Sequence, residues 1–555
     1  MSVKKELRMK LDKFFKKYFE DYMEINPLTA TFIGINKYNH VYPNYLSDQV
    51  IEKNKKFYED YLDKLYEIKD DIYGKISDEE NYYIDVLEYR LKDNIQSFNH
   101  PFHLIPLNQF DNFILDYVEM CSGKGYLPLK TKKDFNNLIL KTSDFLIFCD
   151  TAICRMREGM DKKITLPKEV MRRVVEQLKD LKTTKDYILD EKTVPESIYE
   201  EYKKIFEGKF TKMINKFIKF LENEYIPVCR DKLGLKFMPQ GKEMYKYLVE
   251  SYTNNRNISI DWIQKIGLKE CTRIQKEIED LFKNNDMDVP KTSENFLFDS
   301  KEDVIKDYER VREIINKKLV PKYFDIKISH DYLIKKVPKF KEENDAGAYY
   351  MMPSYDNKRK GTFYLNMNNL ADHQTYSTMS LSLHEGNPGH HFQLTYCNDN
   401  DIPDFIKYCD DETIYVEGWA LYCESLTHDF LKNSTKKEDI MFRYGCYNYE
   451  IMRAARLLVD TGIHYYGWNY KKCFDFMKSF TNFSDNEIEV EIYRYTSYPG
   501  QALTYKLGEI HFQELRDNFL KKNKNLKLFH REVLKRGSSP MNLLHKIVKS
   551  SQKKM

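Results

Sequence analysis

The spacing of apolar residues constrains the fold of this chain more than any other feature. From the N-terminus to about Pro338, apolar residues recur at intervals of three and four, and Pro, Gly and Asn interrupt them. This period places the apolar residues on one face of a helix, so it predicts packed helices. Examples are residues 51–69, 135–157, 168–181 and 214–225. The same pattern returns at Tyr376 and continues to the C-terminus, which predicts a mainly α fold.

The one clear change of pattern lies between residues 348 and 366. Residues 349–354 and 361–366 are rich in aromatic and other apolar residues, and the turn-like segment 356–361 lies between them. We therefore expect a short hairpin.

The chain has 555 residues, which is long for one hydrophobic core at roughly 100–200 residues per domain. We therefore expect two or more lobes. The charged segment 339–345 is the best candidate for a boundary, although an ordinary solvated loop explains it equally well. The predicted division is an N-terminal lobe of residues 1–340 and a C-terminal lobe of residues 341–555.

The composition argues against several classes of partner. The sequence is 42% hydrophobic and 32% charged, with a formal net charge of only +3, so neither a nucleic-acid nor a membrane partner is implied. No apolar run approaches the ~20 residues that span a bilayer, and the N-terminus shows no apolar signal core. The ten cysteines form no Cys-x-x-Cys pair, which favours reduced thiols. A cytoplasmic location is expected, and the sequence does not indicate an oligomeric state.

Three of the thirteen histidines lie in residues 381–393. This segment begins like the zinc signature His-Glu-x-x-His, in which two histidines one helical turn apart bind Zn²⁺ and the glutamate is the general base. His384 and Glu385 match that signature, but Pro388 stands where the second histidine belongs. Because proline cannot bind a metal, a later histidine must supply the second ligand.

In a regular helix, neither His390 nor His391 could bind the same metal ion as His384. His390 would lie on a different face of the helix, and His391 would lie on the same face but ~10 Å further along it. Pro388 offers the solution, since a proline in a helix clashes with the carbonyl four residues back, here that of His384. Gly389 accepts an unusual backbone conformation. We predict that the helix widens or breaks between Asn387 and His390. His390 is favoured as the ligand because it needs the smaller distortion, and His391 is the alternative.

A third ligand is expected from the segment 415–424. Glu417 and Glu424 are seven residues apart, so they share a helix face but lie two turns apart. Only one of them can ligate the metal. Glu417 is the predicted ligand, and Glu424 would then orient a histidine from behind.

Two further segments carry candidate groups. In residues 493–506, a tyrosine hydroxyl near the metal could stabilise an oxyanion, and Arg494 could hold a peptide carboxylate; an aromatic core explains these tyrosines equally well. The helix 453–464 offers Arg456, Asp460 and His464, for which a structural pair is the simpler interpretation.

Several motifs in order resemble the large, mainly bacterial family called domain of unknown function eight-eight-five. The matching motifs are His384-Glu385-x-x-Pro388-Gly389-His390-His391, Glu417-Gly418-Trp419-Ala420-x-Tyr422-x-Glu424, Asp460-Thr461-Gly462-Ile463-His464, Tyr498-Pro499-Gly500-Gln501-Ala502-x-x-Tyr505-Lys506, Gly361-Thr362-Phe363-Tyr364-x-Asn366, Pro353-Ser354-x-Asp356 and Pro27-x-x-Ala30-Thr31-x-x-Gly34. The resemblance covers nearly the whole chain. Members are similar to helical zinc peptidases of the thimet oligopeptidase and carboxypeptidase Taq type.

The resemblance implies two helical lobes around a cleft, a small sheet beside the zinc helix, and metallopeptidase activity. It implies that Tyr505 is the tyrosine that stabilises the transition state. It also implies that the strand of residues 361–366, which includes Tyr364, is an edge strand that pairs with an extended peptide.

The sequence thus predicts a peptidase with one Zn²⁺ held by His384, His390 and Glu417. Glu385 would take a proton from water, and Tyr505 or His391 would stabilise the oxyanion. The expected partner is a short peptide, and the supporting or substrate-binding groups are Glu424, Arg494, Tyr498, His464, Asp460 and Tyr364. The alternatives are a related hydrolase of another amide or ester, and an inactive peptide-binding protein.

Overall fold

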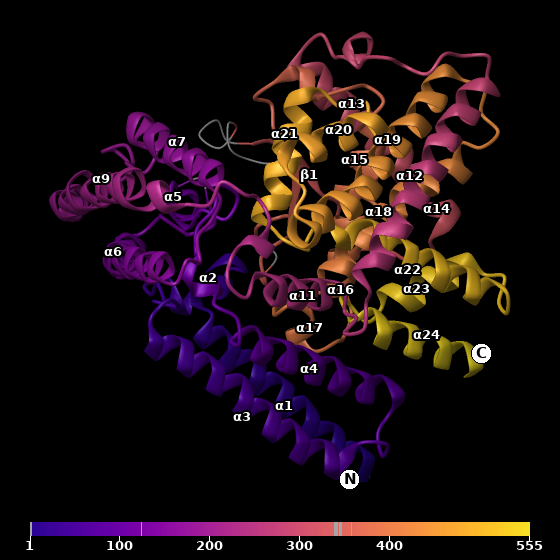
Figure 1. Ribbon diagram of the computed structural model, residues 1–555. Coiled ribbons are helices and arrows are strands. Elements are labelled where there is room, and N and C mark those ends of the chain that lie inside the picture. Colours follow the sequence, from indigo (N-terminus) through magenta and orange to yellow (C-terminus); the bar gives the residue numbers. More distant parts are fainter. Residues whose placement is uncertain (1–2, 124, 338–341, 343–346, 357, 555) are drawn as a thin grey trace.

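The computed structural model describes residues 3–123, 125–337, 342, 347–356 and 358–554. Helices dominate this part of the chain (Figure 1), as the apolar spacing predicts. The four segments taken as examples all lie in helices, in α3, α6, α7, and α9 with the π-helical turn that follows it.

The first four helices are α1 (Val3–Ile25), α2 (Pro27–Phe32), α3 (Asp48–Ile72) and α4 (Asp78–Ser97). Their boundaries have local causes. Pro27 occupies the first turn of α2, where its missing N–H is not needed. Ser47 caps α3, and Ser77 forms a capping box with Glu80 at the start of α4.

A second group of helices stands apart at one side of the molecule, in purple to magenta in Figure 1. It consists of α5 (Phe113–Cys121), α6 (Lys132–Asp161), α7 (Lys168–Thr184), α8 (Tyr199–Lys203), α9 (Thr211–Phe220) and α10 (Ile226–Val228). These helices share a hydrophobic core of their own that is rich in Phe and Tyr.

The rest of the chain forms the larger part of the molecule. Its helices before the sheet are α11 (Gly241–Tyr252), α12 (Ile260–Lys283), α13 (Lys301–Ile314) and α14 (Val320–Tyr323). Those after the sheet are α15 (Thr378–Glu385), α16 (His390–Asp399), α17 (Asp404–Tyr408), α18 (Thr413–Phe430), α19 (Lys437–Thr461), α20 (Tyr470–Phe480), α21 (Asp485–Ser497), α22 (Leu503–Leu520), α23 (Leu526–Leu534) and α24 (Met541–Lys554).

The largest hydrophobic core joins the first helices to the last ones. It contains Leu11 and Tyr18 of α1 together with Phe405 and Phe529. The buried guanidinium of Arg90 strengthens this junction, because it donates to the Glu412 carboxylate (3.3 Å) and to the carbonyls of residues 405 and 538 (3.1 Å each). The predicted lobe boundary near residue 340 falls on 338–341 and 343–346, outside the described residues. That division stays a prediction.

The sheet has three short strands, β1 (Leu333–Lys336), β2 (Ala348–Met351) and β3 (Thr362–Leu365). The predicted hairpin is confirmed, since β2 pairs antiparallel with β3 in the register Tyr349 to Tyr364. The edge position of residues 361–366 is wrong. A third strand that we did not predict, β1, pairs parallel with β3, so β3 is the central strand and β1 and β2 are the outer ones. A polar, partly exposed strand as short as β1 leaves little signal in the sequence.

Candidate metal centre

The helix that carries the histidines breaks where the sequence predicts. α15 ends at Glu385 and α16 begins at His390, with four non-helical residues between them. The turn is tight, because a Cβ on Gly389 would lie 1.9 Å from the carbonyl oxygen of His384. The Trp419 indole donates a hydrogen bond of 2.9 Å to the Pro388 carbonyl and so holds the break against α18.

The break brings His390 beside His384. The two rings lie 4.7 Å apart between centroids and nearly perpendicular to each other. His384 Nε2 is 3.3 Å and His390 Nε2 is 3.6 Å from Oε2 of Glu417 on α18. Within the described part of the chain, this is the one group of three His, Cys, Asp or Glu residues that could hold a metal ion. Their ligand atoms all lie within 4.8 Å of one another. The predicted ligand set therefore converges, with His390 and not His391 as its second histidine.

The spacing of these atoms suits a tetrahedral zinc ion. Zn–N and Zn–O bonds of about 2.0–2.1 Å at tetrahedral angles separate neighbouring ligand atoms by about 3.3 Å. Two imidazoles and one carboxylate form a donor set of catalytic zinc sites, and the fourth position is left for water or substrate. The side chains of His390 and Glu417 keep 12% and 17% of their surface exposed, so the cluster is open on one side.

Glu424 lies behind His384, where the sequence predicts an orienting carboxylate. Its Oε1 is 2.8 Å from His384 Nδ1, which leaves Nε2 for the cluster. Ser380, one turn before His384 on α15, donates to the other oxygen of Glu424. The Arg453 guanidinium lies 3.6 Å from the same carboxylate.

The charges in this group are mutually dependent. Burial lowers the pKa of His384, but hydrogen bonds with Glu417 and Glu424 raise it to about 9. Burial raises the pKa of Glu417, but the two histidines hold it well below its usual value. Glu417 therefore stays ionised at neutral pH.

Glu385, next to His384, is buried and lies within the electrostatic reach of both histidines. Burial raises its pKa, and the opposing effects of His390 and His384 are smaller. A carboxylate with a raised pKa is a stronger base. This is the property that the predicted role of Glu385 requires.

Tyr505 approaches the cluster from α22. A Cβ on Gly418 would lie 2.4 Å from the Cα of Gly508, so α18 and α22 touch through their backbones at this point. This close contact places the Tyr505 ring nearly parallel to that of His384, with centroids 6.2 Å apart. Gly418 follows Glu417 directly, and its function in helix packing is not evident from the motif.

Three arginines surround the Tyr505 ring. The guanidinium carbons of Arg453, Arg456 and Arg494 lie 5.7, 4.7 and 5.9 Å from its centroid. Arg494 also donates to the Tyr505 hydroxyl at 3.0 Å, and the Glu491 carboxylate binds Arg456 at 2.8 Å. Glu424 and Glu491 partly offset the charge of these arginines. The sequence prediction named Arg456 and Arg494 but not Arg453.

His391 points elsewhere, which removes its proposed oxyanion function. Its Nδ1 is 2.9 Å from the Tyr350 hydroxyl and 3.3 Å from that of Thr395, and its Nε2 is 3.1 Å from the carbonyl of residue 330. Burial lowers its pKa to about 3. His391 is a neutral, buried residue that connects α16 to β2.

His464 and Asp460 are also buried residues whose polar atoms bond to neighbouring parts of the fold. His464 accepts from the backbone N–H of Leu235 at Nδ1 (3.1 Å), and its Nε2 lies 2.9 Å from the Tyr495 carbonyl. Asp460 accepts from the Tyr245 hydroxyl and from the Gly500 N–H. Both belong to the core that supports the segment before Tyr505, and neither reaches the cluster.

The two remaining candidates are both tyrosines. Tyr498 lines a cavity of about 870 Å³. Tyr364 on β3 stacks on Tyr349 of β2, with ring centroids 5.2 Å apart, so it supports the sheet.

Some residues of the site escaped the sequence prediction. These are Ser380, Arg453, Glu491, Trp419 and Gly418. Trp419 holds the break, and Gly418 lets α18 approach α22. Ser380 and His384 are four residues apart on one helix, a spacing that places them on the same face. That signal was available, whereas the contacts of Arg453 and Glu491 join different helices and leave no local pattern.

Comparison with known proteins agrees with this architecture. Residues 27–548 match the family described as "Bacterial protein of unknown function (DUF885)". The chain belongs to this family. No curated protein matches the sequence.

Two solved structures are similar over nearly their full length. One is a "putative lipoprotein" from Colwellia psychrerythraea, with 21% identity, a TM-score of 0.84, and coverage of 99% of this chain and 100% of the other. The second is a "putative lipoprotein of unknown function" from Shewanella oneidensis, with 16% identity, a TM-score of 0.71 and coverage of 97% and 99%. At these identities they show the shared fold alone. No described helix of the present chain is long and apolar enough to cross a membrane.

Proposed function

We propose that this protein is a zinc-dependent peptidase that hydrolyses short peptides. The observation that carries the proposal is the convergence of His384 Nε2, His390 Nε2 and Glu417 Oε2 beside the buried Glu385. Two imidazoles, one carboxylate and an adjacent general base are the residue types that metal-assisted hydrolysis of an amide uses.

One zinc ion would be held by His384, His390 and Glu417. Bound there, it would supply Lewis acidity, which polarises a carbonyl and lowers the pKa of water. Glu424 fixes the ring of His384 through Nδ1, so that Nε2 keeps its direction.

Glu385 and Tyr505 would carry the proton transfer and the oxyanion stabilisation. Glu385 accepts the proton of the attacking water and passes it to the leaving amine, which its raised pKa favours. The Tyr505 hydroxyl accepts from Arg494, so its own proton is directed away from that contact. It can donate to the oxyanion as the substrate carbon becomes tetrahedral.

The substrate would lie as an extended chain along β2. β2 is the outer strand whose Tyr350 reaches His391, the neighbour of His390. Extended peptides bind by adding to a sheet. Helices surround the site, which favours short peptides over folded proteins.

The proposal is tested with purified protein expressed with added zinc. We expect about one zinc per chain and cleavage in a peptide library. Glu385→Gln should retain the zinc and lose about 10²- to 10⁴-fold in kcat, as expected for loss of a general base. Glu279→Gln is a matched control, because Glu279 is exposed on α12. If zinc is present only in trace amounts, or if Glu385→Gln cleaves as fast as the wild type, the proposal is wrong.

A further inference from the structure

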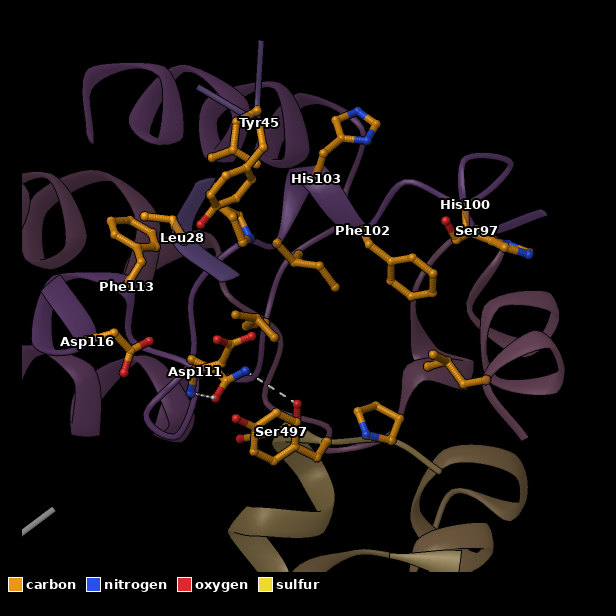
Figure 2. A pocket seen from close by; sticks show the side chains of 18 of the residues that line it. Leu28, Tyr45, Ser97, His100, Phe102, His103, Asp111, Phe113, Asp116 and Ser497 are labelled. Atoms are coloured by element: carbon orange, nitrogen blue, oxygen red, sulfur yellow. Dashed lines mark hydrogen bonds between the residues drawn. The ribbon is translucent and has the colours of Figure 1, made fainter. Parts of the chain in front are cut away.

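A cavity of about 870 Å³ lies between the α5–α10 group and the larger part of the molecule. Its walls come from α2, the loop and helix around residues 108–119, strand β2 and the segment 496–499. Figure 2 shows Asp111 and Asp116 along one wall, with Ser497 of the larger part facing them. Its size is that of a ligand pocket, typically about 300–1,000 Å³.

The charged residues of this cavity have one sign. Asp111, Asp116 and Glu119 line it, and the described lining includes no Lys or Arg, although the chain has 89 of them. His100 and His103 also line it, but burial lowers the pKa of both. They are therefore neutral at pH 7, and the described wall is acidic.

Asp111 is the acid that the fold leaves without a counter-charge. Its carboxylate forms neither an ion pair nor a side-chain hydrogen bond with any described residue, and its surface faces the cavity. Partial burial raises its pKa, and no described cation offsets this effect, although the residue stays exposed where it lines the cavity. A cationic ligand would supply the missing charge.

The position of Asp111 is preorganised. Asn108 Oδ1 accepts the backbone N–H groups of residues 110 and 111, at 2.8 Å each. Asn108 Nδ2 donates to the Ser497 carbonyl, and the Ser497 hydroxyl donates to Gln109. The loop is thus held to the end of α21, so binding has little ordering cost.

Aromatic rings complete the wall. Tyr45, Tyr252 and Tyr498 line the cavity, and Asp111 contributes to the raised pKa of each of them. Aromatic faces attract Lys, Arg and ammonium groups. An unpaired carboxylate among tyrosines is therefore suited to an organic cation.

The cavity wall continues to the metal centre. Tyr350 lines the cavity and contacts His391 through its hydroxyl. On the opposite side, Tyr498 and Pro499 line it, and the chain continues directly into α22 with Tyr505. A peptide that reaches the cluster along β2 passes this space.

We propose that the cavity binds a cationic group of the peptide substrate, at Asp111 and the surrounding tyrosines. The group is an ammonium or a guanidinium, supplied by the amino terminus or by a Lys or Arg side chain. That the ligand is a substrate rests on the proposed function; that the cavity prefers cations does not.

The test measures binding to Glu385→Gln protein, so that no hydrolysis is needed. Four forms of one short peptide series are compared by calorimetry, with Lys or norleucine in the chain and a free or acetylated amino terminus. We expect at least one replacement of a cation to weaken binding about tenfold, the value of one charge-assisted contact. The replacement that weakens it identifies the source of the cation. Equal binding of all four forms overturns the proposal.

Asp111→Asn in the same background should remove most of that preference. Asp116→Asn is a second variant on the same wall, should Asp111→Asn fail to fold. Asp150→Asn is the matched control, because Asp150 lies on α6 of the same helix group and pairs with Lys216 at an exposed position. A preference that survives both cavity variants overturns the proposal. Cation-selective binding by a protein that cleaves no peptide would refute the proposed function and leave the cavity assignment intact.

Discussion

Two regions of this protein carry buried histidines beside acidic residues, and only one has the form of a metal centre. His384 and His390 direct Nε2 toward one oxygen of Glu417, and no hydrogen bond from another described residue competes for those two atoms. His464 uses both ring nitrogens for backbone groups, and Asp460 beside it accepts from Tyr245 and Gly500. Residue types are similar in the two regions, although His390 and Glu417 stay partly exposed and the His464 region is fully buried. The partners of the ring nitrogens distinguish them.

The largest difference is expected for metal binding. His390→Asn should weaken zinc binding more than about a hundredfold, since even the loss of an outer partner of a ligand costs roughly 10- to 100-fold. Competition with a fluorescent chelator measures the affinity. His464→Gln is the matched control and should keep full zinc affinity, with a loss of stability of about 1–3 kcal/mol from unpaired backbone groups. Equal zinc affinity of the two variants would show that the His390 region and the His464 region do not differ in metal binding.

A smaller effect on zinc affinity is expected for Glu424, which contacts His384 on the side away from the cluster. Glu424→Gln keeps the shape of the side chain but removes the charge that orients His384. Zinc affinity should fall roughly 10- to 100-fold. The same chelator competition measures it, with Glu279→Gln as the control. An unchanged affinity would mean that Glu424 only fills space.

The smallest effect is expected for the pH dependence of stability, at Asp460 in the region around His464. Burial raises the pKa of Asp460 to about 7, against the weaker opposing effects of Tyr245 and Gly500. The folded state therefore holds this proton more tightly than the unfolded state, where the pKa is close to 3.8. The stabilisation is complete below pH 3.8 and is lost as the pH rises through 7.

Asp460→Asn should remove this dependence. The difference in free energy of unfolding between wild type and variant should change by roughly 1 kcal/mol per pH unit between pH 5 and pH 7. Urea denaturation at several pH values measures it. Parallel pH profiles would show that Asp460 is ionised throughout. The zinc affinity of this variant should stay unchanged, because Asp460 does not reach the cluster.

The same contrast explains how far the sequence could be interpreted. The helical class, the hairpin and the break at Pro388 were predictable because each depends on residues close together in the chain. His384, His390 and Glu417 were predictable because zinc accepts few donor types and Pro388 limits the possible second ligand. β1 and the central position of β3 were missed, since pairing between strands 29 positions apart in the register depends on the whole fold.

The sequence by itself determined the helical architecture, the place where the histidine-bearing helix breaks and the residues that meet there. Only the tertiary structure decided that both ring nitrogens of His391 and of His464 already have hydrogen-bond partners. It also decided that Gly418 and Gly508 let α18 and α22 touch, and that three arginines surround Tyr505. The physical reason is range. Backbone sterics and helix period act over a few residues, whereas the partners of a buried polar atom are set by helices that meet only when the chain has packed.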